Sequence, residues 1–376
     1  MLPTKVQVLA DTDRVLEAGD LLTGRVGGLG QFAVYEDEAP ASFSDNTLRL
    51  RLKGLHRQRA RFIAEFLNSQ PGRVQLLRDS RGGLQKVVTQ ESVGRIVIPD
   101  LGASEARLVA ELDAARAERD RALAEAEELL ARFEAWALDT MGVRQANPVQ
   151  RKAFAVRAGS ALKRLDPFHH SPAFIEIERA ITSVPHVRVG DVAVFSSDTW
   201  SPGDHPDPTF RYIEISGVDR RRGKAVAVEV RTEEAPSRAR MAVQPGDLIV
   251  SLTRPHHGSI ALLGPEHAGC VASTGFSVIR QVSDCTTAAF LWVVLRLSYS
   301  LQQMLRRASG GNYPAITQDE LANIVVPLPD KRIQTRIVDE AISRSEKADA
   351  LEQHAETLWQ QARERFEQQL LQGAPA

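Results

Sequence analysis

Basic and polar side chains gather in loops of the second half of the sequence. Arg254-Pro-His-His-Gly258 follows an apolar stretch that predicts a strand, and Ser273-Thr274 precedes another. Arginine, histidine and asparagine side chains can hydrogen-bond to base edges, whereas hydroxyl groups and lysines hold phosphates. The first loop is therefore either a DNA-reading loop or an ordinary solvated turn. Ser273-Thr274 either holds a phosphate or is buried against backbone.

A glycine-rich loop and a basic turn belong to the same group. Gly310-Gly-Asn-Tyr-Pro314 can bring backbone close to a partner because glycine has no side chain, although a tight helix-to-strand connection explains it equally well. Arg220-Arg-Arg-Gly-Lys224 is a hairpin turn whose cations contact phosphate or simply face solvent. Together with the loop Arg81-Gly-Gly-Leu-Gln-Lys86, the candidate DNA contacts are Arg254, His256, His257, Ser273, Thr274, Arg221, Arg222, Lys224, Asn312, Tyr313, Arg81, Gln85 and Lys86.

These residues make no catalytic or metal-binding motif. His256 and His257 are adjacent and have no cysteines at zinc-ligand spacing. Asp166-Pro-Phe168 and Asn147-Pro148 lack the second proline of the amino-methyltransferase motif, and no Gly-Lys-Ser/Thr phosphate loop is present. The sequence therefore offers no amino-methyltransferase site, no phosphate loop and no zinc site.

Two long charged helices are predicted to position the loops. The first fills most of residues 102–142, from about Ser104 to Thr140; the second begins after Pro329, where Asp330 can cap free N–H groups, and fills residues 331–371. A helix of roughly 37 residues is about 55 Å long. Their apolar residues form narrow seams, which favour antiparallel packing of one helix on the other. The seam residues are Leu112, Ala115, Arg119, Ala122, Ala126, Leu129, Phe133 and Trp136, and then Ile337, Ala341, Ala348, Leu351, Ala355, Leu358 and Ala362.

The two halves of the chain are copies of one unit. Gly82 matches Gly310 at an offset of 228 in the numbering, as Ile96 matches Ile324, and Ala18-Gly-Asp-Leu-Leu22 matches Pro245-Gly-Asp-Leu-Ile249 at an offset of 227. A nearly constant offset over about eighty residues indicates an internal duplication. Each copy is predicted to be a compact domain followed by a long helix, and the shorter first copy is predicted to be truncated at its N-terminus.

The predicted fold class is α+β. Two compact domains, each α/β with small mixed sheets, are separated by two long helices packed as an antiparallel coiled coil. The first domain takes residues 1–101 and the second takes residues 165–330. Residues 143–164 form a linker between the first long helix and the second domain.

Charge is unevenly distributed along the chain, although the net charge is only -1. Residues 102–140 carry five arginines against ten acidic residues, and residues 331–371 carry seven basic against eight acidic residues. We therefore expect acidic helices and basic compact domains, with any phosphate contact on the domains.

The second half resembles the specificity subunit of type I restriction-modification enzymes. The resemblance depends on the duplication and on the order of Gly246-Asp-Leu-Ile249, Ser273-Thr-Gly-Phe-Ser-Val-Ile279, Gly310-Gly-Asn312, Ile324-Val-Val-Pro-Leu-Pro329 and Gln334. It implies two domains that each read one part of a split DNA site, and two helices that set the distance between them. The chain itself would be non-catalytic.

The same resemblance implies partners. Methyltransferase subunits, expected to number two, would supply S-adenosylmethionine and methylate adenine, and a restriction subunit would cleave double-stranded DNA. Trp136, Trp359, Phe133 and Leu358 are candidate docking residues for these subunits, with packing between the helices as the alternative. A coiled-coil scaffold that binds proteins rather than DNA is the other functional hypothesis.

The remaining composition favours the cytoplasm. Cys270 and Cys285 are predicted to be small buried residues without a disulfide. The sequence shows no signal peptide and no apolar run of membrane-spanning length, so we expect a soluble protein.

Overall fold

The computed structural model describes residues 4–5, 14–24, 31–79, 88–146, 153–157, 159, 164–205 and 207–372. The chain divides into two compact units. The first unit comprises Met1–Glu125 with Ala350–Ala376, and the second comprises Ala126–Asp349. Helices α5 (Ser104–Thr140) and α12 (Lys331–Gln372) each contribute one part to each unit. The fold class is α+β, as predicted.

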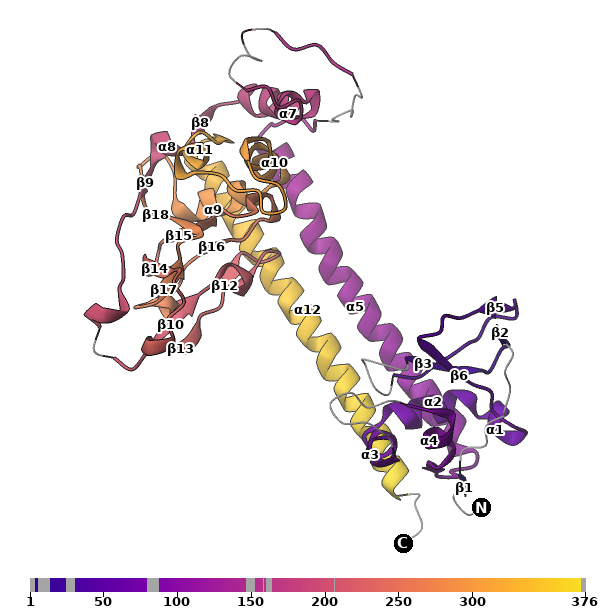
Figure 1. Cartoon of the computed structure of the whole chain (residues 1–376). Coiled ribbons are helices and arrows are strands. Elements are labelled where there is room, and N and C mark those ends of the chain that lie inside the picture. Colours follow the sequence, from indigo (N-terminus) through magenta and orange to yellow (C-terminus); the bar gives the residue numbers. More distant parts are fainter. Residues whose placement is uncertain are drawn as a thin grey trace. The chain divides into compact units, whose positions relative to one another are not determined.

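The two long helices pack antiparallel within each unit. In the first unit, Leu112 near the start of α5 shares a core with Phe366 near the end of α12. In the second unit, Ala137 near the end of α5 shares a core with Ile337 near the start of α12. The predicted seams are confirmed, because their alanines Ala122, Ala126, Ala348, Ala355 and Ala362 are all buried. The two helices are the long purple and yellow ribbons of Figure 1.

The start of α12 follows the capping prediction. The backbone N–H of Ile333 donates to Asp330 Oδ1 at 3.0 Å. An N-terminal carboxylate of this kind satisfies one of the free N–H groups of the first turn. Asp330 therefore fixes the residue at which the long helix begins.

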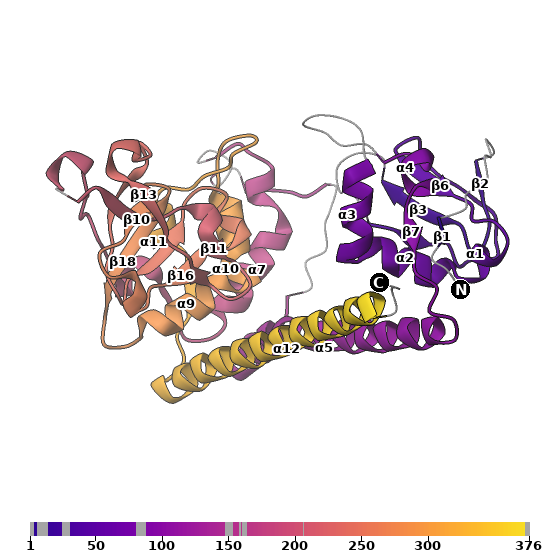
Figure 2. The same cartoon turned by 90° about the horizontal axis from the view of Figure 1, so that it is seen from below.

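The first unit places short helices beside small antiparallel sheets, as the purple part of Figure 2 shows. Its strands pair as β4-β3-β6, β2-β5 and β1-β7. Helix α2 is amphipathic and buries the face that carries Phe62, Ile63, Phe66 and Leu67. The elements are β1 (Thr4–Lys5), β2 (Val15–Leu16), β3 (Leu21–Gly24), β4 (Ala33–Val34), β5 (Ala41–Ser42), β6 (Thr47–Leu50), α1 (Leu55–Gln58), α2 (Ala60–Asn68), α3 (Gln70–Asp79), α4 (Gln90–Gly94) and β7 (Val97–Ile98).

The second unit holds two four-stranded sheets, β16-β15-β18-β9 and β13-β10-β17-β14, and the pairs β11-β12 and β19-β8. All pairings are antiparallel except that of β10 with β17. The strands are β8 (His186–Arg188), β9 (Ala193–Phe195), β10 (Thr209–Ile213), β11 (Val218–Asp219), β12 (Lys224–Ala225), β13 (Val228–Arg231), β14 (Ala239–Ala242), β15 (Leu248–Ser251), β16 (Ile260–Leu262), β17 (Val271–Ser273), β18 (Phe276–Val282) and β19 (Val325–Pro327). The helices are α7 (Pro172–Thr182), α8 (Val189–Val192), α9 (Ala288–Arg296), α10 (Ser298–Arg307) and α11 (Gln318–Ala322).

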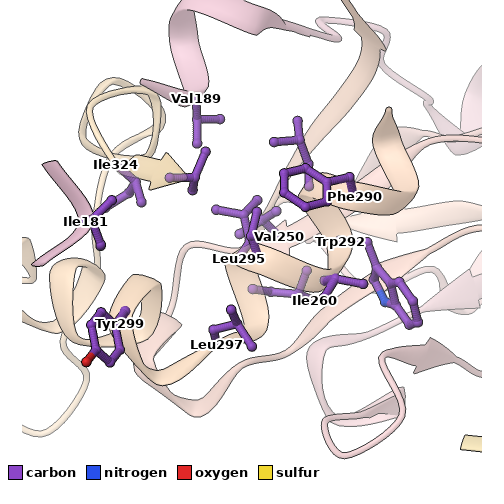
Figure 3. Packing of buried hydrophobic residues seen from close by; sticks show 14 of the residues in the cluster. Ile181, Val189, Val250, Ile260, Phe290, Trp292, Leu295, Leu297, Tyr299 and Ile324 are labelled. Carbon is purple, nitrogen blue, oxygen red and sulfur yellow. The ribbon is translucent and has the colours of Figure 1, made fainter. Parts of the chain in front are cut away.

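One hydrophobic core ties these helices to the sheet of β15, β16 and β18. Phe290 and Leu295 of α9 pack with Val250 and Ile260, and Trp292 lies at the edge of the group (Figure 3). The side chain of Phe290 is completely buried. This core holds rigid the strand ends from which the polar loops project.

The internal duplication recurs element by element. Helices α2, α3 and α4 match α9, α10 and α11 at both ends, at an offset of 228 in the numbering. Thr89 and Thr317, related by the same offset, each form a capping box at the helix that follows. Leu297 takes an extended conformation and divides α9 from α10, as Ser69 divides α2 from α3.

A buried ion pair is repeated as well. Arg51 donates to both carboxylate oxygens of Asp20, and Arg280 donates to Asp247 Oδ1 at 2.6 Å. Asp20 and Asp247 are almost inaccessible to solvent. Burial raises the pKa of Asp247, and the hydrogen bonds from Arg280 and Gln244 oppose this. In each copy the aspartate directly precedes a strand, β3 or β15, and the arginine lies just after or within the neighbouring strand, β6 or β18, so the pair is a structural feature of both copies.

The copies differ in the region before this aspartate. The strand β1 pairs with β7 in the register in which β8 pairs with β19, so Lys5 corresponds to Arg188. Fifteen residues separate Lys5 from Leu21, whereas fifty-nine separate Arg188 from Leu248. The first copy is therefore shorter than the second between its outer strand and β3, and its truncation at the N-terminus stays a prediction.

Two further observations concern the whole chain. Cys270 is buried as expected, but Cys285 is exposed because it lies in the polar turn after β18. Within the described part of the chain, no helix is both long enough and apolar enough to cross a membrane.

Candidate nucleic-acid interface

Arg254 occupies a strained position directly after β15. Its backbone angles, φ 46° and ψ 51°, place it in the left-handed region, and it is the one non-glycine residue with positive φ among those described. Its N–H donates to the carbonyl of Pro314 at 2.7 Å. A left-handed non-glycine residue persists only where surrounding contacts hold it. The structure therefore fixes the direction in which this side chain leaves the backbone.

The Arg254 side chain joins the glycine-rich loop. Its guanidinium donates to the Asn312 carbonyl at 2.9 Å and lies over the Tyr313 ring, 4.4 Å from the centroid. Tyr313 is 71% exposed, which is unusual for a large aromatic side chain. The loop itself is closed by paired backbone hydrogen bonds between Ser309 and Ala315. Two segments that are distant in sequence thus present a guanidinium and an aromatic face together.

The adjacent histidines add protonatable groups beside Arg254. Burial, then the neighbouring charges of His257 and Arg254, lower the pKa of His256. For His257, the causes of the lowered pKa are burial followed by Arg220 and Arg254. His257 is exposed and its ring lies 4.5 Å from that of His256. Both histidines are therefore mainly neutral near pH 7 and can gain charge beside an anion.

Side chains of α9 hold the basic hairpin between β11 and β12 through hydrogen bonds to its backbone. Trp292 Nε1 donates to the Gly223 carbonyl at 3.0 Å, and Arg296 donates to the carbonyls of Arg220 and Arg221. Gly223 has φ 64°, and a Cβ there would lie 2.3 Å from Trp292 Nε1, so no larger residue fits. Burial lowers the pKa of Arg296 to about 10, although the charge of Asp219 opposes this.

Two of the predicted phosphate contacts on this hairpin are instead paired within the protein. Arg222 and Lys224 both donate to the Asp349 carboxylate on α12, Lys224 at 2.8 Å. The Arg222 side chain is only 13% exposed. Arg222 therefore fixes the hairpin to α12, which is a better account of it than a surface phosphate contact. Arg220 and Arg221 lie at the tip of the hairpin. Of these two arginines, Arg220 is the one whose charge acts on His257.

Other predicted contacts fall away from this cluster. Ser273 lies in β17, is buried, and its Oγ accepts from the Gly275 N–H at 3.2 Å, so the alternative of burial against backbone applies. Thr274 is exposed in the turn that follows. Arg81, Gln85 and Lys86 lie outside the described residues.

The predicted docking residues are partly covered. Trp136 packs against the core of the second unit beneath Arg336 and Arg344, and Phe133 lies beside it. Trp359 packs in the first unit beneath Arg116 and Arg119. Leu358, like these three, is half-buried. Phe133, Trp136 and Trp359 pack against the cores of their own units, and the docking role of all four residues stays a prediction.

The charge prediction is wrong for the second domain. Residues 165–330 carry fifteen basic and eighteen acidic residues, a net of -3, whereas residues 1–101 carry fourteen and twelve, a net of +2. The excess of positive charge lies in residues 143–164, which carry six basic residues and no acidic one. The second domain therefore offers a local cationic site, formed by Arg254 and Arg220, and not a broadly basic surface.

Several positioning residues escaped the sequence reasoning. Asp349, Trp292 and Arg296 hold the hairpin, yet each lies far from it in sequence. The repeat offset could have revealed Gln303 and Asp247, since Gln75 and Asp20 occupy the matching positions. No group of three or more His, Cys, Asp or Glu residues suited to a metal ion occurs in the described ranges.

The segment that carries these loops is similar to a known family. Residues 186–356 match the family described as the type I restriction modification DNA specificity domain. The chain is similar to the type I restriction enzyme HindI specificity subunit of Haemophilus influenzae, with 26% identity over 166 residues, which are 44% of this chain and 33% of that protein. It thus spans about a third of that relative's length.

Solved structures show similarity as well. The HsdS subunit from Thermoanaerobacter tengcongensis is 34% identical over 42% of this chain and 41% of its own, with a TM-score of 0.38. The S subunit of a type I restriction-modification system from M. genitalium is 13% identical over 96% of this chain and 84% of its own, with a TM-score of 0.46. Residues 186–356 of this chain thus match the DNA specificity domain of type I restriction-modification systems.

Proposed function

We propose that this chain is the DNA-recognition subunit of a type I restriction-modification complex and is itself non-catalytic. One observation carries the proposal: within the family-matched range, Arg254, Asn312 and Tyr313 meet at the surface of the second unit. A surface guanidinium held by backbone contacts can pair with guanine or phosphate, and Asn312 and Tyr313 can contact bases or sugars beside it.

The partners follow from the family. We propose double-stranded DNA as the ligand, methyltransferase subunits, two in number, and a restriction subunit as protein partners, and the cytoplasm as the location. S-adenosylmethionine would bind the methyltransferase subunits. The half-buried Trp136 and Trp359 and the antiparallel packing of α5 on α12 in each unit support a role for the long helices in subunit docking.

Methylation mapping tests the proposal directly. The chain would be co-expressed with its methyltransferase partner in a host that lacks adenine methylation of its own. We expect methylated adenine at one recurring sequence, and none with either protein alone. An unmethylated genome in the presence of a stable complex would overturn the proposal.

A salt series separates DNA binding from protein scaffolding. Binding dominated by phosphate contacts weakens log-linearly and steeply with salt, because counterions are released from DNA. The complex with a duplex from the mapped target should show such a slope, and Arg254→Ala should lower the affinity. Affinity indifferent to Arg254→Ala would instead favour a scaffold that binds proteins.

A further inference from the structure

Three loops of the second unit form its candidate DNA-binding surface. The duplication identifies the segments of the first copy that correspond to these loops. The loops are the hairpin tip at Arg220, the turn at Arg254 and the closed loop at Tyr313. Each is fixed by described contacts to α9, to the Pro314 carbonyl or across its own base. The surface therefore depends on all three loops being present.

The hairpin has no room in the first copy. Strands β10 to β13, with the hairpin between β11 and β12, lie in the fifty-nine residues that separate Arg188 from Leu248. The matching interval between Lys5 and Leu21 holds only fifteen residues. Fifteen extended residues span at most about 50 Å, and part of that length is needed to reach β3. Four additional strands cannot form there.

The other two loops differ in chemistry. Between β3 and β4 the sequence reads Arg25-Val-Gly-Gly-Leu-Gly-Gln-Phe32, where the second copy has Leu252-Thr-Arg-Pro-His-His-Gly-Ser259 before β16. The segment of the first copy contains one cationic residue, Arg25, which follows the last residue of β3 in sequence, and it contains no histidine. Leu84 and Gln85 stand at the positions that match Asn312 and Tyr313 through the repeat offset. Without a tyrosine, the cation–π contact that orients Arg254 has no counterpart.

We propose that the first copy supplies only sequence-independent contacts, so that the DNA target is specified in a single block read by the second unit. This inference rests on the proposed function and adds which part of the chain determines specificity. The charge balance is compatible with it: residues 1–101 carry a net charge of +2, and their described part holds no cationic cluster of the kind formed by Arg254 and Arg220 in the second unit.

The test is selection of binding sites from a random duplex library by the assembled complex, followed by methylation mapping of the same complex. We expect one block of specified base pairs, with the flanking region on one side unspecified. Two separated blocks of comparable information content would overturn the inference and leave the proposed function intact. No enriched sequence and no methylation would reject the proposed function, and the inference with it.

Variants in each copy test which of the two determines the sequence specificity. Arg254→Ala with Tyr313→Ala should alter the specified block, weakening binding to the original sequence on the order of tenfold or more relative to a mismatched one. Gln85→Ala and Arg25→Ala are the matched controls in the first copy. They should leave the selected motif unchanged. A motif altered by either control would contradict the inference.

Discussion

Gln303 hydrogen-bonds to both backbone groups of Val325: its Nε2 donates to the carbonyl at 2.8 Å and its Oε1 accepts from the N–H at 3.0 Å. Gln75, its counterpart in the first copy, makes the same two bonds to Val97. In each copy, a glutamine side chain of α10 or α3 thus makes the two backbone hydrogen bonds that a neighbouring strand would make with β19 or β7. The duplication therefore preserves single hydrogen bonds as well as the order of elements.

Gln303→Leu should destabilise the second unit by about 1 to 3 kcal/mol, because it leaves two backbone groups of Val325 without their partner in a site where Gln303 is 1% exposed. Gln75→Leu, at the more exposed matching site, should cost less. Urea denaturation followed by far-UV circular dichroism measures both. Equal effects of the two substitutions would show that burial does not set the cost.

Asp349→Asn should release the β11–β12 hairpin from α12. The carboxylate is 37% exposed, so we expect a loss of only about 1 kcal/mol at pH 7. Burial alone would raise the pKa of Asp349, but the hydrogen bonds from Lys224 and Arg222 outweigh it and lower the pKa below 3.8. The contribution is therefore present above about pH 4 and lost as pH falls through the lowered pKa.

Thermal unfolding at a series of pH values measures this effect. The wild type should lose more stability than Asp349→Asn on acidification below pH 4, so the two curves converge. Glu356→Gln, an exposed site two turns further along α12, is the control and should leave the curve unchanged at pH 7. Identical curves for Asp349→Asn and the control would show that the hairpin does not depend on this ion pair.

The spacing of apolar residues in the sequence was sufficient to predict the two long helices. The seam positions and the Asp330 cap were predicted because they depend on residues close together in the chain, where spacing determines the face of a helix. The break at Leu297 was not, since no glycine or proline marks it. Its origin is tertiary: the break lets Ser300 Oγ donate to the Val294 carbonyl and α10 pack beside α7.

The candidate site was predicted only in part. Arg254, Asn312 and Tyr313 were chosen separately by residue type, but their long-range contact depends on the closed loop and on a left-handed backbone. Arg222 and Lys224 were assigned to phosphate because their sequence neighbours are cations. Their partner, Asp349, lies on α12, which is far from the hairpin in sequence. No residue near Arg222 or Lys224 in the chain indicates that they pair with Asp349.

Arg254→Gly should separate folding from recognition. Glycine adopts positive φ without steric cost, so removing the strain of about 1 kcal/mol offsets the loss of the Asn312 hydrogen bond and the Tyr313 contact. We expect the free energy of unfolding to change by less than about 1 kcal/mol. Affinity for the target duplex should fall on the order of tenfold. Loss of stability in parallel with affinity would assign Arg254 a structural role.

His257 should make DNA binding dependent on pH. Burial, then Arg220 and Arg254, hold its pKa below 6.5 in the free protein, whereas a nearby phosphate would favour the charged form and raise it. A pKa that rises on binding means that a proton is taken up, so affinity should increase as pH falls from about 7 to below 6. His257→Gln should flatten this dependence, measured by fluorescence anisotropy at constant ionic strength. His354→Gln, an exposed site on α12 outside the second unit, should not. A dependence that survives His257→Gln would point to His256, the other histidine of lowered pKa beside Arg254, as the residue that is protonated.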